Sequence, residues 1–103
     1  MKSLICITTC NRLLYLKYIL PEYIEFCQQN SEFDFLISLD GNSEENIAFL
    51  KEQGIPFIYS EEREGVGLAK NRVLEHFPDY DYYFFIDDDV QLLNGDIFHG
   101  YIR

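Results

Sequence analysis

Apolar residues along the chain gather in short continuous runs that alternate with longer stretches of helical periodicity. Four runs are β-rich and apolar on both faces, which is typical of strands buried in a parallel sheet, and they span residues 3–8, 35–39, 56–60 and 82–86. Helical patterns lie between them, at about residues 13–29, 43–53 and 67–76. The predicted order of elements is therefore β-α-β-α-β-α-β.

Capping and breaking residues mark the predicted helices. Asn11 is placed to cap the first helix, and Pro21 inside that helix predicts a kink or a division into two short helices. Asn42 and Glu45 have capping-box spacing for the second helix, and Gly54 suits its C-terminal stop. These signals support short connections between the strands and the helices.

Strands that are apolar on both faces and joined by helices predict an α/β fold, a doubly wound, mostly parallel sheet covered on two sides. Right-handed crossovers leave few arrangements, of which the Rossmann-like strand order 3-2-1-4 is favoured. A chain of 103 residues is long enough for a single domain, residues 1–103, with one core. In this order the first and fourth strands are neighbours, and ligands bind at their carboxyl ends.

Polar residues that interrupt the apolar pattern lie at the predicted carboxyl ends of the strands. Because these ends share one edge of a parallel sheet, the residues are expected to surround a single cleft. In the order of the first, second and fourth strands they are Thr8, Thr9, Cys10, Asn11 and Arg12, then Asp40 and Gly41, then Asp87, Asp88 and Asp89.

The chain is acidic, with 18 acidic against 8 basic residues and a formal net charge of −10. Such a surface repels nucleic-acid backbones and anionic membranes, so neither is expected as a direct partner. No apolar run approaches the roughly 18 residues needed to span a bilayer, and the N-terminal stretch lacks the pattern of a signal peptide. Cys6, Cys10 and Cys27 have no metal-binding spacing and are predicted to be reduced thiols in a cytoplasmic protein.

Asp87, Asp88 and Asp89 bring three like charges to the end of an apolar strand. In an extended segment Asp87 and Asp89 would point the same way, and carboxylates about 5 Å apart repel by roughly 3 kcal/mol. Such a cluster retains a proton or binds a cation, and its hard oxygen ligands suit Mg²⁺ or Mn²⁺. A bound dication would also let an acidic protein accept phosphates. The alternative is a solvated acidic loop.

Four segments of the chain resemble, in order and spacing, the nucleotide-binding half of family 2 glycosyltransferases with the GT-A fold. They are ICITTCNR (5–12), ISLDGN (37–42), EREGVGLAKNRVLEH (62–76) and YYFFIDDDV (82–90). The resemblance implies a chain that is truncated relative to a full GT-A domain and forms its donor-binding half. It also implies transfer of a sugar, with inversion, from a nucleotide-sugar, commonly a UDP-sugar.

The resemblance assigns nucleotide-sugar contacts to residues at the predicted edge. Thr8 is similar to the residue that contacts the base and ribose, and Thr9 follows it in the same cleft. Arg12 resembles a basic residue near the nucleotide pocket, and Asp40 resembles the aspartate that hydrogen-bonds the base. Lys70 matches a basic position that approaches the base or the phosphates, although a solvated position on the helix is an equal alternative.

The metal site implied by the resemblance is a DxD motif formed by Asp87 and Asp89. Asp89 matches the direct ligand of Mn²⁺ or Mg²⁺, which binds the diphosphate, and Asp88 matches a ribose-binding position. Cys10 departs from the pattern, because many relatives carry an aromatic residue there that stacks on the base.

The general base that an inverting transferase needs is not visible. Neither Asp96 nor His99, in the tail after Asp89, belongs to a recognisable base motif. A non-catalytic nucleotide- or cation-binding module is therefore an alternative, as is a fragment whose second half comes from a partner chain or a homo-oligomer. The acceptor is undefined and could be a saccharide, lipid-linked molecule or protein, so a peripheral place at the inner membrane face stays open.

A third alternative is a receiver-like phosphoacceptor domain, which also clusters aspartates in a doubly wound fold. Such a domain would carry its acidic residues after the first and third strands. This chain has Thr8, Thr9 and Ser60 at those positions, so the receiver-like alternative ranks well behind.

Overall fold

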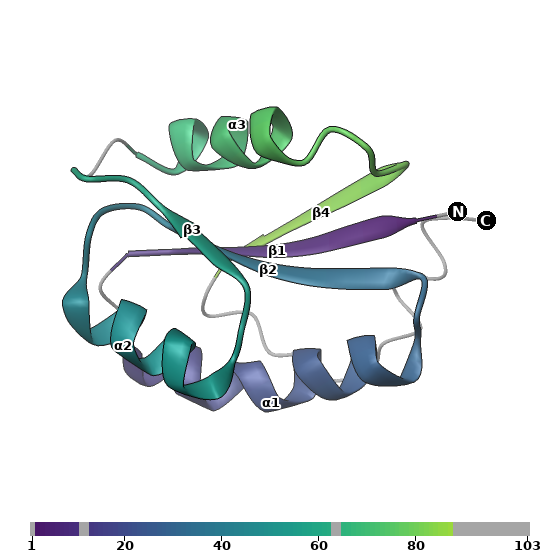
Figure 1. Cartoon of the computed structure of the whole chain (residues 1–103), viewed down its shortest axis with the longest axis horizontal. Helices are drawn as coiled ribbons and strands as arrows, with labels where there is room; N and C mark the ends of the chain where they lie inside the picture. The colour runs from purple at the N-terminus through teal and green to yellow at the C-terminus, as the bar shows by residue number, and fades with distance from the viewer. Residues whose placement is uncertain (1, 11–12, 63–64, 88–103) are drawn as a thin grey trace.

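The structure is a computed structural model that describes residues 2–10, 13–62 and 65–87 (Figure 1). Strands and helices alternate along the chain as predicted. The elements are β1 (Ser3–Thr9), α1 (Leu13–Gln29), β2 (Phe33–Leu39), α2 (Glu44–Gln53), β3 (Phe57–Tyr59), α3 (Val66–His76) and β4 (Tyr82–Asp87).

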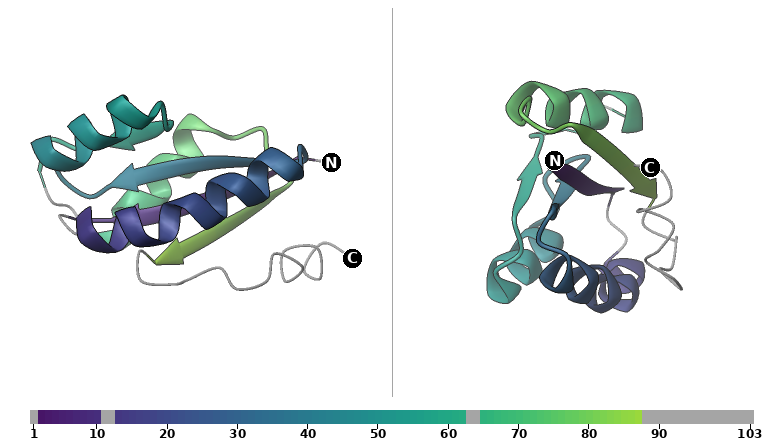
Figure 2. Two further views of the ribbon diagram at one scale, coloured as in Figure 1. Left: turned by 90° about the horizontal axis from the view of Figure 1, so that it is seen from below. Right: turned by 90° about the vertical axis from the view of Figure 1, so that its right-hand side faces the viewer.

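The four strands form one parallel sheet in the order β3-β2-β1-β4. Helices α1 and α2 cover one face of the sheet and α3 covers the other, as the views in Figures 1 and 2 show. The predicted α/β class and the predicted strand order 3-2-1-4 are confirmed. The carboxyl ends of β1 and β4 are neighbours at the point where the winding direction changes, which is the usual place for a ligand in this class of fold.

The core lies on both faces of the sheet because β1 and β2 are apolar on both sides. Alternate residues of β1 point to opposite faces, so Ile5 and Ile7 pack under α1 and α2 while Leu4 and Cys6 pack under α3. Every residue of β1 is buried. This double burial explains why the sequence shows continuous apolar runs and no alternation.

Helix α1 is a single helix of 17 residues with Pro21 inside it, so the predicted division into two short helices is wrong. Pro21 lies on the exposed side. The opposite side buries four large side chains against the sheet: Leu16, Ile19, Leu20 and Tyr23. This burial offsets the hydrogen bond that a proline removes from a helix interior.

The start of α2 corrects the predicted capping box. Ser43, and not Asn42, is the N-cap, and its Oγ accepts a bond from the backbone N–H of Asn46. Asn42 instead donates its side-chain amide to the Glu61 carboxylate, 3.4 Å away. The predicted stop is confirmed, since Gly54 adopts a left-handed conformation with φ of 69°.

Strand β3 is only three residues long, and Pro56 gives the physical reason. The N–H of Ile37 donates to the carbonyl of Pro56, so the alternate residue Phe35 also directs its peptide group toward β3. Pro56 has no N–H to donate to the carbonyl of Phe35. The pairing of β2 with β3 therefore begins at Phe57. The first half of β2 extends past β3 as a result.

Candidate functional site

The carboxyl edge of the sheet brings together residues from β1, β2 and β4. Thr8 pairs with Ser38 on β2 and with Asp87 on β4. Paired residues of a parallel sheet point to the same face, and Ser38 donates its hydroxyl to the Ala69 carbonyl of α3. Thr8 therefore lies on the α3 side of this edge, and the backbone of Asp87 is its neighbour on β4. This is the proximity that the sequence predicted for the first and fourth strands.

Thr8 carries a buried polar atom at the end of β1. The residue is 5% exposed, and its Oγ1 has no hydrogen-bond partner among the described residues. A buried hydroxyl without a partner is costly, so most such groups in folded proteins are paired. The Thr8 hydroxyl is accordingly available to a polar ligand group at this edge. Thr9 is buried as well, and its carbonyl accepts the N–H of Asp40.

Asp40 is a buried carboxylate at the end of β2, with 4% of its surface exposed. Both of its oxygens lie 3.1 Å from the N–H of Gly65, the N-cap residue of α3. The carboxylate of Asp40 therefore lies at the N-terminal end of α3. The sequence located Asp40 at the edge, but the bond to Gly65 depends on the tertiary arrangement and was not predicted.

Ser60, after β3, connects two loops at the same edge. Its Oγ accepts the N–H of Gly41 at 3.0 Å and donates to the carbonyl of Glu62 at 2.7 Å. Gly41 has φ of 118°, a conformation that favours glycine. Sequence reasoning assigned Ser60 no role, although a polar residue that ends an apolar strand was a usable signal.

Lys70 lies in α3, above the pair formed by β1 and β4. Its Nζ is 5.8 Å from the ring centroid of Phe85, a residue two positions before the end of β4. The lysine also lies near the Cys6 thiol and favours its ionised form, but burial dominates and raises the pKa of Cys6 to about 12. Lys70 is thus a half-buried cation on the same side of the sheet as Thr8.

Three of the predicted site residues, Arg12, Asp88 and Asp89, lie outside the described residues. For Asp87 the structure gives the backbone position at the end of β4. Within the described ranges, no group of three or more acidic, histidine or cysteine side chains is arranged to hold a metal. The predicted metal site therefore stays a prediction.

The cysteines are free thiols in different surroundings. Burial raises the pKa of Cys6 to about 12, and burial together with the Asp34 charge raises that of Cys27 to about 12. Both are therefore protonated and unreactive at neutral pH, since the thiolate is the nucleophile. Cys10 is half-buried directly after β1, at the candidate site.

We expect N-ethylmaleimide at pH 8 to label Cys10 about tenfold faster than Cys6 or Cys27 in the folded protein, because the raised pKa values leave little thiolate at the other two. Peptide mass mapping over time measures the three rates. In urea all three thiols should react at similar rates. Equal rates in the folded protein would contradict the burial of the two inner thiols.

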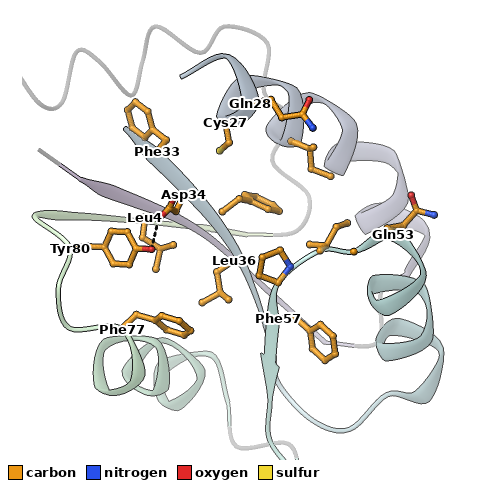
Figure 3. A pocket seen from close by; sticks show the side chains of 15 residues that line it. Leu4, Cys27, Gln28, Phe33, Asp34, Leu36, Gln53, Phe57, Phe77 and Tyr80 are labelled. Carbon is orange, nitrogen blue, oxygen red and sulfur yellow. Dashed lines mark hydrogen bonds between the residues drawn. The ribbon is translucent and has the colours of Figure 1, made fainter. Parts of the chain in front are cut away.

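A groove of about 600 Å³ lies at the opposite end of the sheet, beside the part of β2 that β3 leaves uncovered (Figure 3). Its lining is mostly apolar. Tyr80 donates its hydroxyl to Asp34 at 2.6 Å, and Lys2 forms an ion pair with the same carboxylate. These contacts tie the amino-terminal ends of the strands together. The predicted site residues do not line this groove.

The carboxyl edge thus combines several chemical capacities in a small space. Asp40 accepts hydrogen bonds, the Thr8 hydroxyl donates or accepts, and Lys70 and the first turn of α3 supply positive potential. Such a set suits a ligand that is anionic at one part and has hydrogen-bond donors at another. Of the helices in the described part of the chain, none combines the length and apolar character needed to cross a membrane.

Comparison with known families gives one match. The family model described as glycosyl transferase family 2 matches residues 4–99, nearly the whole chain. The match includes every element of the sheet and all the residues placed at its carboxyl edge. No curated protein matches the chain significantly.

Proposed function

The chain belongs to glycosyl transferase family 2, and on this premise we propose that its carboxyl edge binds the nucleotide part of a sugar donor together with Mn²⁺ or Mg²⁺. The observation that carries the proposal is the register of Thr8 with Asp87, because it joins the first strand's threonines to the start of the aspartate triplet. Residues 1–103 act as one donor-binding domain. The donor is a UDP-sugar, and the sugar is transferred with inversion.

The nucleotide contacts come from β1, from α3 and from the residue that follows β2. Asp40 accepts a hydrogen bond from the base, and the buried Thr8 hydroxyl pairs with a polar group of the base or ribose. Lys70, above β1 and β4, faces the phosphates. Thr9 positions Asp40 through the bond from the Asp40 N–H to its carbonyl. Arg12 adds positive charge near the nucleotide, and Asp88 binds the ribose.

The donor set at the end of β4 fits a hard dication. Asp87 is the last residue of β4, and Asp89 follows it two positions later in the sequence. Carboxylate oxygens are the ligands that Mn²⁺ and Mg²⁺ prefer, so Asp87 and Asp89 would hold the ion. When bound, the ion stabilises the negative charge of a diphosphate leaving group. The Thr8 hydroxyl, for which the described part of the chain offers no hydrogen-bond partner, supports a polar ligand next to β4.

Calorimetric titration with UDP tests the proposal. We expect UDP to bind with Mn²⁺ present and at least tenfold more weakly without it, because the acidic protein otherwise repels the diphosphate. Asp89→Asn should abolish the effect of Mn²⁺, since an amide is a much poorer ligand than a carboxylate.

Asp79→Asn is the matched control. Asp79 is an exposed aspartate between α3 and β4, away from the carboxyl edge, so its loss should leave UDP binding unchanged. Equal UDP affinity with and without Mn²⁺ would contradict the metal site. Binding without sugar transfer, or transfer only after a partner chain is added, would favour the non-catalytic or fragment alternative.

A further inference from the structure

The first part of β2, residues 33–36, has no partner strand on the β3 side in the described part of the chain. Ile37 is the first residue of β2 that bonds in that direction, through its N–H and the carbonyl of Pro56. Phe35 directs its peptide group the same way, but neither its N–H nor its carbonyl has a hydrogen-bond partner among the described residues. This edge of the sheet therefore offers one donor and one acceptor to another extended backbone.

The groove of about 600 Å³ beside this open edge has walls from both faces of the sheet (Figure 3). Ile24 and Cys27 belong to the core cluster under α1 and α2, and Phe77 and Tyr80 belong to the cluster under α3. All four side chains line the groove and are half-buried. Successive side chains of a strand point to opposite faces, so a strand added beside β2 would extend both clusters.

The chemistry of the groove fits an extended peptide better than a helix or a lipid. A helix satisfies its own backbone groups, and an acyl chain has no hydrogen-bonding group, so neither can pair with the N–H and carbonyl of Phe35. An extended peptide supplies both partners and presents side chains to both walls. The carbonyl of Pro56 is already bonded to Ile37, so such a peptide can pair with β2 only before that point.

Charge favours a basic partner over a second copy of the chain. Each copy carries a formal charge of −10, so two copies repel each other. Asp34 is the only charged residue among the described residues that line the groove, and Lys2 pairs with it at 3.2 Å. The lining is therefore close to neutral, while the protein as a whole attracts cations. A segment with an apolar centre and basic flanks matches both properties.

We propose that residues 33–36 of β2 are a docking site for an extended segment of another protein, which adds to the sheet as a short strand. The segment has about four apolar residues, to match the open part of β2, and Lys or Arg on either side. The site lies at the end of the sheet opposite to the carboxyl edge, so docking does not depend on the proposed function. It would hold the chain to a partner and leave the carboxyl edge open.

Hydrogen exchange with a probe peptide, Lys-Lys-Val-Ile-Val-Ile-Lys-Lys, tests the docking site directly. We expect the Phe35 N–H to exchange about tenfold more slowly when the peptide is bound, because the peptide backbone replaces water as its partner. The Ile37 N–H should change little, since it is already bonded to Pro56. NMR measures both rates. Binding without protection of Phe35, or no binding, would overturn the inference.

A modified peptide separates strand pairing from hydrophobic contact. N-methylation of two adjacent central residues keeps the side chains but removes an N–H from each edge of the peptide strand. The modified peptide should bind about tenfold more weakly in calorimetric titration, since a backbone hydrogen bond is lost. Equal affinities for the two peptides would mean that the backbone of β2 is not used.

Two exposed positions give a matched pair of protein variants. Gln53→Lys adds a positive charge to the lining of the groove and should weaken binding of the basic peptide about threefold at low salt. Asn42→Lys adds the same charge after the carboxyl end of β2, far from the groove, and should bind the peptide like the natural protein. Equal weakening in both variants would mean that net charge alone attracts the peptide.

The oligomeric state distinguishes a separate partner from a second copy. We expect the protein without peptide to sediment as a monomer, with the Phe35 N–H unprotected. A dimer in which this N–H is protected would make a second copy the occupant and overturn the choice of a basic partner. UDP binding in the presence of Mn²⁺ should be the same with and without the peptide, so failure of one proposal leaves the other standing.

Discussion

Replacing Asp40 with asparagine is expected to weaken UDP binding about 30-fold, equivalent to about 2 kcal/mol, because a hydrogen bond to a charged acceptor is lost. The carboxylate is buried and accepts the N–H of Gly65 on both oxygens. Asparagine keeps the shape but carries no charge, so it accepts a hydrogen bond more weakly than the carboxylate. Calorimetric titration with UDP at saturating Mn²⁺ measures the change.

The matched control for this variant is Asp34→Asn. Asp34 lies within β2 and accepts a hydrogen bond from Tyr80, at the end of the sheet opposite to Asp40. We expect the Asp34→Asn variant to bind UDP with the same affinity as the natural protein. An Asp40→Asn variant that binds UDP as tightly as the natural protein would remove Asp40 from the nucleotide site and leave the fold unaffected.

Replacing Ile37 with alanine is expected to lower the free energy of unfolding by about 3 kcal/mol, because the change leaves a cavity in the core. Ile37 is fully buried in β2, paired with Ile7 on one side and Phe57 on the other. For a domain of this size the loss corresponds to a fall in the melting temperature of about 12–24 °C. Thermal unfolding followed by circular dichroism measures it.

Leu14→Ala removes the same number of carbon atoms from an exposed position. Leu14 is 83% exposed in α1, so its loss should change the free energy of unfolding by less than about 0.5 kcal/mol. Similar melting temperatures for the two variants would contradict the assignment of Ile37 to the core.

The strand order could be predicted because the apolar pattern of the strands and the handedness rules for their connections lead to the same sheet. The strand Ser3–Thr9 carries apolar residues on both faces, and this requires burial on both faces, which a parallel sheet between helices provides. The order then followed from handedness rules that do not depend on individual side chains. The placement of Thr8 beside Asp87 followed directly from that order.

Details that depend on competition between neighbours could not be predicted. Asn42 and Ser43 are both good caps, and the choice of Ser43 follows from the contact of Asn42 with Glu61 in another loop. Pro21 is accommodated in α1 because burial of the opposite face outweighs one lost hydrogen bond. The links from Asp40 to Gly65 and from Ser60 to Gly41 join residues that are distant in sequence. No local pattern indicates such pairs.

Pro56 gives the β3 side of the sheet a stepped outline. The outermost strand has three residues, and beyond Pro56 the border steps back to β2. A straight, continuous border would be a template on which strands of other molecules could add, which is the first stage of aggregation. The open edge is therefore divided between the short strand β3 and the first half of β2. Pro56, which has no N–H, lies where the two parts meet. The same residue that shortens β3 therefore shortens the border on which a foreign strand could add.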